Sequence, residues 1–84
     1  MARYTVVWVQ SAEDELVDLW LASGDRADIS AAVNSIDEAL CSDAETKGHA
    51  LAEELRSFNA PPIRVLFSVR SDDRVAEILS VRRV

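Results

Sequence analysis

The chain has 84 residues, of which 49% are hydrophobic and 29% are charged, and its net charge is -6. This length leaves room for one domain, residues 1–84, and the composition is typical of a folded protein rather than a disordered one. The negative charge argues against a general affinity for nucleic acid, which depends on attraction to phosphates. The lone Cys41 favours a reducing compartment, and the longest apolar run, Val6–Val9, is too short to span a membrane. We therefore expect a cytoplasmic, single-domain protein.

The first half of the chain predicts one strand and then two helices. Residues 3–10 are rich in β-branched and aromatic side chains on both faces, as in a strand within a sheet. Ser11 opens a capping-box-like sequence, apolar residues follow at helical spacing, and Gly24 is placed to end this helix. Asp25 is placed to cap a second helix, which carries the clearest apolar stripe in the chain: Ile29, Val33, Ile36 and Leu40. The short connection predicts an antiparallel helix hairpin.

The second half of the chain predicts an antiparallel meander. Residues 42–48 form a polar connection, and residues 51–58 fit either a helical turn or a strand, which the Pro61–Pro62 pair would end. Residues 63–70 alternate between two faces as a strand does, and residues 75–82 form the returning strand after a tight turn.

A turn centred on Asp72 and Asp73 sets the expected register of this hairpin. One face is almost wholly apolar and pairs Val69 with Ala76, Phe67 with Ile78, and Val65 with Ser80. The other face is semi-polar and pairs Ser68 with Glu77, Leu66 with Leu79, and Arg64 with Val81. Because the apolar face needs a cover and the helix stripe needs a sheet, we expect an α+β fold with both helices on one sheet face.

The uncovered sheet face is the expected binding surface. Leu66 and Leu79 lie across from each other there, and a small domain seldom leaves such a pair open without use. Residues 55–84 also hold six arginines against three carboxylates, whereas residues 10–54 hold twelve carboxylates against two cations. Guanidinium groups suit phosphates and carboxylates. The expected partner-binding residues are therefore Leu66, Leu79, Arg64 and Arg82.

Other residues with chemical potential have simpler structural explanations. His49, the only histidine, could act as a general base, but an exposed loop position is the simpler interpretation. Asp14 and Asp18 lie one helical turn apart and could hold a cation, but carboxylates near a helix N-terminus need no metal. Trp8 and Trp20 could stack on bases, but their places in a strand and in a helix stripe indicate the core. We therefore expect neither a metal site nor a cofactor.

The element order and several short segments together resemble one family. The order is a strand, a helix hairpin, a polar loop and a three-stranded antiparallel meander, all within a short chain. The matching segments are WVQSAEDEL from Trp8, Leu19-Trp20, Asp25-Arg26, Gly48, Leu55-Arg56, PIRVLFSV from Pro62, Asp73-Arg74-Val75 and Ile78-Leu79-Ser80-Val81. This ordered set resembles the RelE/ParE toxin superfamily and covers nearly the whole chain.

The resemblance implies the toxin of a type II toxin–antitoxin module, which serves plasmid stabilisation, inhibits growth and is neutralised by a cognate antitoxin. RelE-like members are implied to cleave messenger RNA on the ribosome, and ParE-like members to poison DNA gyrase. An antitoxin is then the expected partner over the leucine pair, with a second copy of the chain as the alternative. A decayed toxin that only binds its antitoxin, or a small domain without toxin ancestry, is the competing interpretation.

The resemblance to the RNA-cleaving members is incomplete at the residues that would carry catalysis. Arg64 stands at the phosphate-stabilising position, Arg56 matches a basic residue after the second strand, and Arg83 lies near the C-terminal basic pair. These three arginines are the candidate catalytic residues. Ala52 and Glu54 replace the family's lysines, and no tyrosine or histidine follows Arg83. We therefore expect a ParE-like or catalytically degenerate member, with weak RNA cleavage at most.

Overall fold

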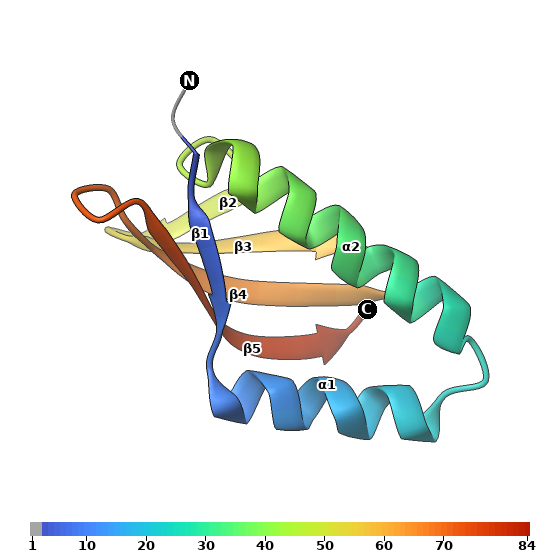
Figure 1. Cartoon of the computed structure of the whole chain (residues 1–84). Coiled ribbons are helices and arrows are strands. Elements are labelled where there is room, and N and C mark those ends of the chain that lie inside the picture. The colour runs from blue at the N-terminus through green and yellow to red at the C-terminus, as the bar shows by residue number, and fades with distance from the viewer. Residues whose placement is uncertain (1–2) are drawn as a thin grey trace.

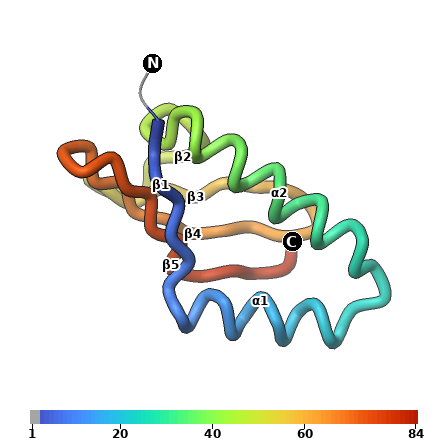
Figure 2. The backbone as a smooth tube through the Cα atoms, in the orientation of Figure 1, coloured from blue at the N-terminus to red at the C-terminus, as the bar shows by residue number. Residues whose placement is uncertain are grey.

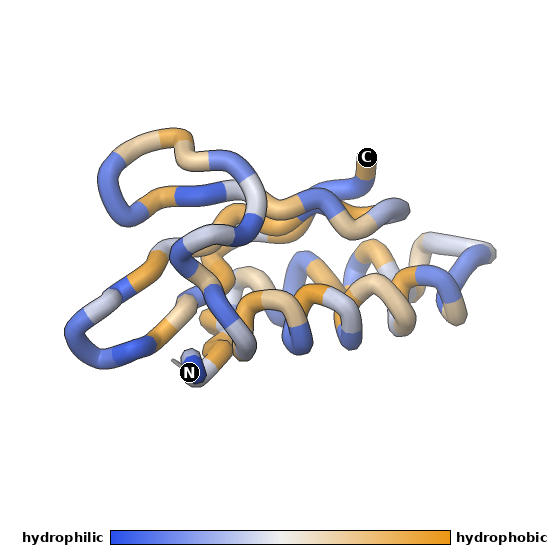
Figure 3. The backbone as a smooth tube through the Cα atoms, turned by 90° about the horizontal axis from the view of Figure 1, so that it is seen from above, coloured by the Kyte–Doolittle hydropathy of each residue, from blue (hydrophilic) through white to orange (hydrophobic). Residues whose placement is uncertain are grey.

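The computed structural model describes residues 3–84, which form an α+β fold with a mixed sheet and a helix layer (Figure 1). The elements of this part are β1 (Thr5–Trp8), α1 (Gln10–Ala22), α2 (Arg26–Asp43), β2 (His49–Ala52), β3 (Leu55–Ala60), β4 (Ile63–Arg70) and β5 (Val75–Arg83). The strand order is β1-β5-β4-β3-β2, in which β1 is parallel to β5 and the other neighbours are antiparallel. Both helices lie on one side of the sheet (Figure 3), as the sequence predicts. Within the described residues, neither helix is long and apolar enough to cross a membrane.

The core lies between the helices and the sheet, and the apolar stripes seen in the sequence build it. The helix α2 contributes three side chains that are at most 1% exposed: Ile29, Ile36 and Leu40. The strands contribute Ile63, Val65, Phe67 and Val69 from β4, and Ala76, Ile78 and Val81 from β5. Alternate residues of β4 are buried because one face of the sheet is covered and the other is not. We call the covered side the helix-side face and the other side the open face.

The junction between β1 and α1 differs from the prediction by one residue. The strand β1 passes from the C-terminal end of α2 to the start of α1 and runs beside β5 (Figure 2). The Val9 N–H donates to the carbonyl of Ile78, and the Val9 carbonyl accepts from the N–H of Glu13. The last bond of the parallel ladder and the first bond of the helix thus share Val9. The helix therefore begins at Gln10, and Ser11 lies inside its first turn instead of starting it.

Ser23 and Arg26 hold the end of α1 and the connection to α2 in place. The sequence predicts instead that Gly24 ends this helix. The Ser23 hydroxyl donates to a carbonyl in the last turn of α1 at 2.6 Å, and the Arg26 guanidinium donates to two more. Asp25 precedes α2 as predicted, but its carboxylate accepts from Arg83 at 2.7 Å. Asp25 therefore ties this connection to β5 instead of capping the helix with its side chain.

The predicted core position of Trp20 is wrong, and Trp8 lies at the margin of the core. Trp20 is 38% exposed, and the guanidinium carbon of Arg26 lies 4.6 Å from its ring centroid. Trp8 is half-buried and donates its indole N–H to the carboxylate of Asp37 at 3.0 Å. Both rings thus combine a partly covered apolar body with a polar or cationic partner, which is favourable at the edge of a layer.

The ambiguous segment at residues 51–58 holds the end of one strand and the start of the next. The strands β2 and β3 pair antiparallel around a turn in which Glu54 adopts a left-handed φ of 68°. The helix α2 extends through Asp43, so the polar connection before β2 is shorter than predicted. The meander therefore contains β2 in addition to the predicted strands, and the Pro61–Pro62 turn separates β3 from β4 as expected.

The β4–β5 hairpin keeps the predicted register near its turn and loses it at a bulge. Three pairs are confirmed: Val69–Ala76, Ser68–Glu77 and Phe67–Ile78. Beyond them the register shifts, and the observed pairs are Leu66–Ser80, Val65–Val81 and Arg64–Arg82. The predicted pairs Leu66–Leu79, Val65–Ser80 and Arg64–Val81 are therefore wrong. Leu79 is the extra residue of the bulge, and the shift buries Val81 where the regular register would bury the hydroxyl of Ser80.

Candidate functional site

Strand pairing places two rows of side chains next to each other on the open face. The first row crosses β3, β4 and β5 and consists of Asn59, Arg64 and Arg82. The second row starts on β2 and consists of His49, Ser57, Leu66 and Ser80. Because directly paired residues project on the same side of a sheet, both rows belong to the open face.

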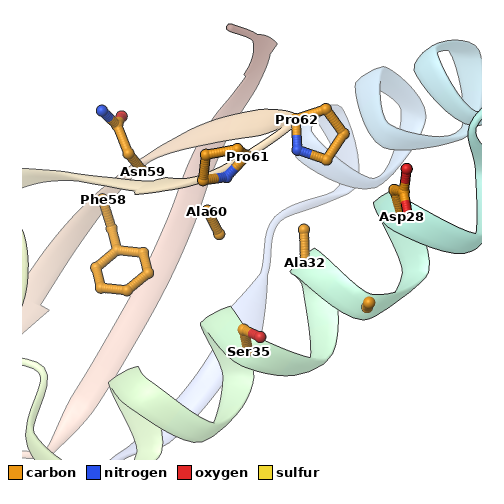
Figure 4. Close-up of a pocket in the computed structure, with 9 residues that line it drawn as sticks. Asp28, Ala32, Ser35, Phe58, Asn59, Ala60, Pro61 and Pro62 are labelled. Atoms are coloured by element: carbon orange, nitrogen blue, oxygen red, sulfur yellow. The ribbon is translucent and has the colours of Figure 1, made fainter.

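A close view of the turn between β3 and β4 supports this assignment of faces. Figure 4 shows Phe58 and Ala60 pointing toward α2 and Asn59 pointing to the other side of the strand. The hollow between α2 and β3 has a volume of about 580 Å³, and most of its lining is small or apolar. That hollow therefore belongs to the helix-side face, and Asn59 belongs to the open face.

Arg64 is an exposed cation of the first row, and Asn59 orients it. The Arg64 Nε donates to the side-chain oxygen of Asn59 at 2.7 Å. This bond uses only the Nε donor of the guanidinium fork, whose terminal nitrogens suit the oxygens of a phosphate or carboxylate. Arg64 is therefore an oriented guanidinium on the open face, and its terminal nitrogens have the donor geometry that suits an anion.

Arg82, which pairs with Arg64, is also held against α1. Its guanidinium forms an ion pair with Glu15, whose other carboxylate oxygen accepts from the main-chain N–H of Val81 at 3.1 Å. The hydrogen bond from Arg82, and then the one from Val81, lowers the pKa of Glu15. The strand β1 pairs with β5 only as far as Ile78. Beyond that point, the Glu15 carboxylate accepts the hydrogen bond of a main-chain N–H at the edge of β5. Arg82 thus fastens the sheet to α1 while it faces Arg64.

Arg83, a candidate catalytic residue, lies on the helix-side face. It pairs with Ile63, which is buried under the helices. Its guanidinium donates to the Asp25 carboxylate at 2.7 Å and to the Ser23 hydroxyl at 3.0 Å. The hydrogen bond from Arg83 lowers the pKa of Asp25. Arg83 therefore joins the end of β5 to the connection between the helices.

Arg56, the third candidate, also lies on the helix-side face, where it pairs with Phe67 across β3 and β4. Its guanidinium donates to the carbonyl of Lys47 at 2.8 Å and to that of Gly48 at 3.2 Å. It therefore holds the loop that leads into β2. The structure does not bring the three candidate arginines together, because Arg64 is on the open face while the other two are on the helix-side face.

A polar hollow joins His49 to Arg64. Its volume is about 360 Å³, and its lining consists of Gly48, His49, Ser57, Phe58, Asn59 and Arg64. Sequence reasoning misses this neighbourhood because every residue of β2 is exposed, so the segment shows no apolar alternation and indicates a loop. An imidazole and a guanidinium on one hollow can bind an anion and exchange a proton with it.

The two leucines of the predicted binding surface are half-buried on this sheet. Leu66 belongs to the second row, and Leu79 is the bulge residue of β5. Toward the hairpin turn, Arg70 forms an ion pair with Glu77 at 3.0 Å. The open face thus carries cations at one end, aliphatic side chains in the middle and a paired charge at the other end.

No protein-family model and no curated protein matches the sequence, but solved structures share the fold. A chain of the toxin–antitoxin complex RelBE2 from Mycobacterium tuberculosis is 21% identical, with a TM-score of 0.82 over 100% of this chain and 94% of that one. A chain of the chromosomal ParDE system from P. aeruginosa is 20% identical, with a TM-score of 0.68 over 100% and 99%. The isolated E. coli RelE toxin is 17% identical, with a TM-score of 0.67 over 96% and 84%. The chain therefore has the fold of the RelE and ParE toxins.

Proposed function

We propose that the chain is the toxin of a type II toxin–antitoxin module, that it inhibits growth, and that a cognate antitoxin neutralises it. The observation that carries the proposal is a fold shared along the whole chain with proteins of toxin–antitoxin systems from three bacteria. One of these structures is a toxin–antitoxin complex. The proposed target is DNA gyrase or the translation machinery, and the proposed subtype is ParE-like or catalytically degenerate.

The open face is the surface that we assign to the antitoxin. Leu66 and Leu79 offer aliphatic contact area in the middle of this face, and Arg64 and Arg82 offer cations beside them. A partner segment with apolar side chains and carboxylates would match both features. A second copy of this chain is the alternative occupant of the same surface.

The test is expression of the chain with and without the protein encoded beside it. We expect the chain alone to arrest growth, the neighbour to relieve the arrest, and the two proteins to co-purify. Replacing Leu66 and Leu79 together by Ser should abolish co-purification while folding is largely kept, because both side chains are only half-buried. Leu51→Ser is the matched control, since Leu51 is 57% exposed on β2, and it should leave co-purification unchanged.

The possible outcomes separate the proposal from its alternatives. A chain that co-purifies with its neighbour without arresting growth is a non-catalytic antitoxin-binding module. A chain that does neither has no toxin function, and the proposal fails. If the double leucine variant still co-purifies, the antitoxin binds somewhere other than the open face.

A weak ribosome-dependent endoribonuclease is the second candidate, and the hollow shared by His49 and Arg64 favours it. In such a cleavage the ribose 2′-hydroxyl attacks the adjacent phosphorus while the 5′-oxygen leaves, so one proton is taken up and another is donated. Arg64 suits the phosphate oxygens, and His49 can carry one of the two protons. Since the lining of this hollow holds a single imidazole, whereas the reaction needs both a proton acceptor and a proton donor, we expect slow cleavage.

Primer extension on messenger RNA after induction measures this activity directly. We expect faint cuts that disappear in both Arg64→Ala and His49→Ala. Arg70→Ala is the control, because Arg70 is a cation of the same face that is engaged by Glu77, and it should keep the cuts. Strong cuts that survive both hollow variants would rule out this hollow as the cleavage site.

A further inference from the structure

The edge of β5 that faces away from β4 is covered by a strand along only part of its length. From Val75 to Ile78 it pairs with β1, and the Val9 N–H donates the last bond of this ladder to the Ile78 carbonyl at 3.1 Å. The strand β5 continues to Arg83, but β1 has by then given way to α1, which begins at Gln10 (Figure 1). The end of β5 is therefore an edge that no other strand of the described residues covers. Such an edge is a template for pairing with another chain.

Two side chains take the place of a neighbouring strand at Val81. The Glu15 carboxylate accepts from the Val81 N–H at 3.1 Å, and the Arg82 guanidinium donates to the Val81 carbonyl at 3.3 Å. The same two side chains form an ion pair with each other. Together they present to Val81 the acceptor and the donor that a paired strand would present. Both main-chain groups of this buried residue thus have partners without a strand.

The exposure of this ion pair indicates that stability is not its main contribution. The Arg82 side chain is 70% exposed and the Glu15 side chain 33%, and exposed ion pairs add little to the stability of a fold. Arg82 also lies directly opposite Arg64 across the sheet, where like charges repel. Charged side chains at an uncovered edge do, however, prevent sheets from joining edge to edge.

We propose that the Glu15–Arg82 ion pair prevents the end of β5 from pairing with a second copy of this chain. A second copy is the occupant, because its β5 carries the same edge, and two identical edges pair antiparallel around a twofold axis. In that arrangement Val81 exchanges both main-chain hydrogen bonds with Val81 of the other copy, in place of the two side chains. This inference does not rest on the proposed toxin function.

The test compares leucine substitutions at two ion pairs of β5. Glu15→Leu removes the acceptor of the Val81 N–H together with the ion pair. Glu77→Leu is the matched control, because Glu77 forms an ion pair with Arg70 at 3.0 Å but pairs with Val7 of β1, so its edge stays covered. By sedimentation velocity, we expect the association constant of Glu15→Leu to rise about tenfold or more over that of the wild type. That of Glu77→Leu should change about twofold at most.

Two milder variants show which hydrogen bond matters and keep the test valid if Glu15→Leu fails to fold. Glu15→Gln keeps an oxygen for the Val81 N–H but loses the ion pair, and Arg82→Leu keeps the bond to Glu15 but uncovers the Val81 carbonyl. Circular dichroism should show both variants folded. We expect their association constants to lie between those of the wild type and Glu15→Leu.

Hydrogen exchange of the Val81 amide locates the contact between the two copies. In dilute Glu15→Leu this amide should exchange faster than in the wild type, because its acceptor is gone. Raising the protein concentration should slow the exchange again, because a carbonyl of the other copy then accepts the N–H. The amide of Phe67, inside the sheet, is the reference and should exchange equally slowly at both concentrations.

Three results would overturn the proposal. If none of the variants at Glu15 and Arg82 associates more than the wild type, the ion pair is only a structural tie between α1 and β5. If Glu77→Leu associates as strongly as Glu15→Leu, the added leucine is the cause. If Glu15→Leu associates while Val81 still exchanges fast, the copies meet at another surface. Absence of growth arrest affects only the proposed toxin function, because this experiment does not depend on it.

Discussion

Replacing Phe67 by Ala should lower the free energy of unfolding by about 3–5 kcal/mol. The Phe67 side chain is 0% exposed, and it lies opposite Ile78 in the cluster between the sheet and the helices. Its truncation removes contacts with both layers and leaves a cavity that close-packed neighbours fill only in part. Urea denaturation of the full chain should show this loss as a lower midpoint with an unchanged slope.

Phe58→Ala provides the matched control for this measurement. Phe58 is also on the helix-side face, but it is half-buried at the margin of the same cluster. The same truncation there should cost less, because fewer contacts are lost and the site is closer to solvent. An unchanged midpoint for Phe67→Ala would place Phe67 at the periphery, and the arrangement of helices over this face would then be wrong.

The parts of the fold that can be predicted from the sequence are those where a residue pattern is compatible with only one kind of secondary structure. The stripe of Ile29, Ile36 and Leu40 has helical spacing, and alternation over residues 63–70 has strand spacing, so each specifies both its element and its buried face. The turn at residues 71–74 then sets the pairs nearest to it, including Phe67 with Ile78. These features are local, and tertiary contacts do not override them.

The β-bulge is a feature that this reasoning cannot supply. The segment from Ile78 to Val81 reads Ile-Leu-Ser-Val, and its apolar side chains allow two registers against β4. One register buries Ser80 opposite Val65, and the other buries Val81 there. The second is favoured because Val81, unlike Ser80, has no hydroxyl that needs a hydrogen-bond partner in the core. The preferred register therefore depends on the partner strand β4 and cannot be inferred from the β5 segment alone.

In the candidate site, too, some features follow from the local sequence and others depend on how the strands pair. Neighbouring residues of a strand project on opposite faces, so Arg82 and Arg83 cannot both belong to one cationic cluster. Arg82 faces Arg64, whereas Arg83 faces the helices and binds Asp25. The exposed strand β2 carries no pattern of its own, and it is the pairing with β3 that brings His49 to the hollow of Arg64.

Gly48→Ala should destabilise the protein by about 2 kcal/mol or more, because two separate costs add at this residue. Gly48 has a φ of 70°, which residues with a side chain adopt only under strain. A methyl group at Gly48 would also overlap the carbonyl oxygen of Ser57 and lie 2.9 Å from its carbonyl carbon. The edge strand β2 would then have to move away from β3, and its pairing of His49 with Ser57 would be lost.

Gly24→Ala makes the same chemical change at a position that, within the described part of the chain, has neither a left-handed φ nor a close neighbour in the way of the methyl group. Among the described residues, nothing lies within 4 Å of the place where its methyl group would sit. We expect this variant to unfold at the wild-type urea midpoint or slightly above it, because alanine reduces the freedom of the unfolded chain. In Gly48→Ala, by contrast, a lower midpoint should be accompanied by a changed NMR signal of His49, since the hollow it shares with Arg64 depends on β2 staying paired. If the two glycine variants unfold at the same urea midpoint, Gly48 does not approach Ser57 as closely as the structure indicates. The pairing of β2 with β3 would then not be what holds the hollow around His49.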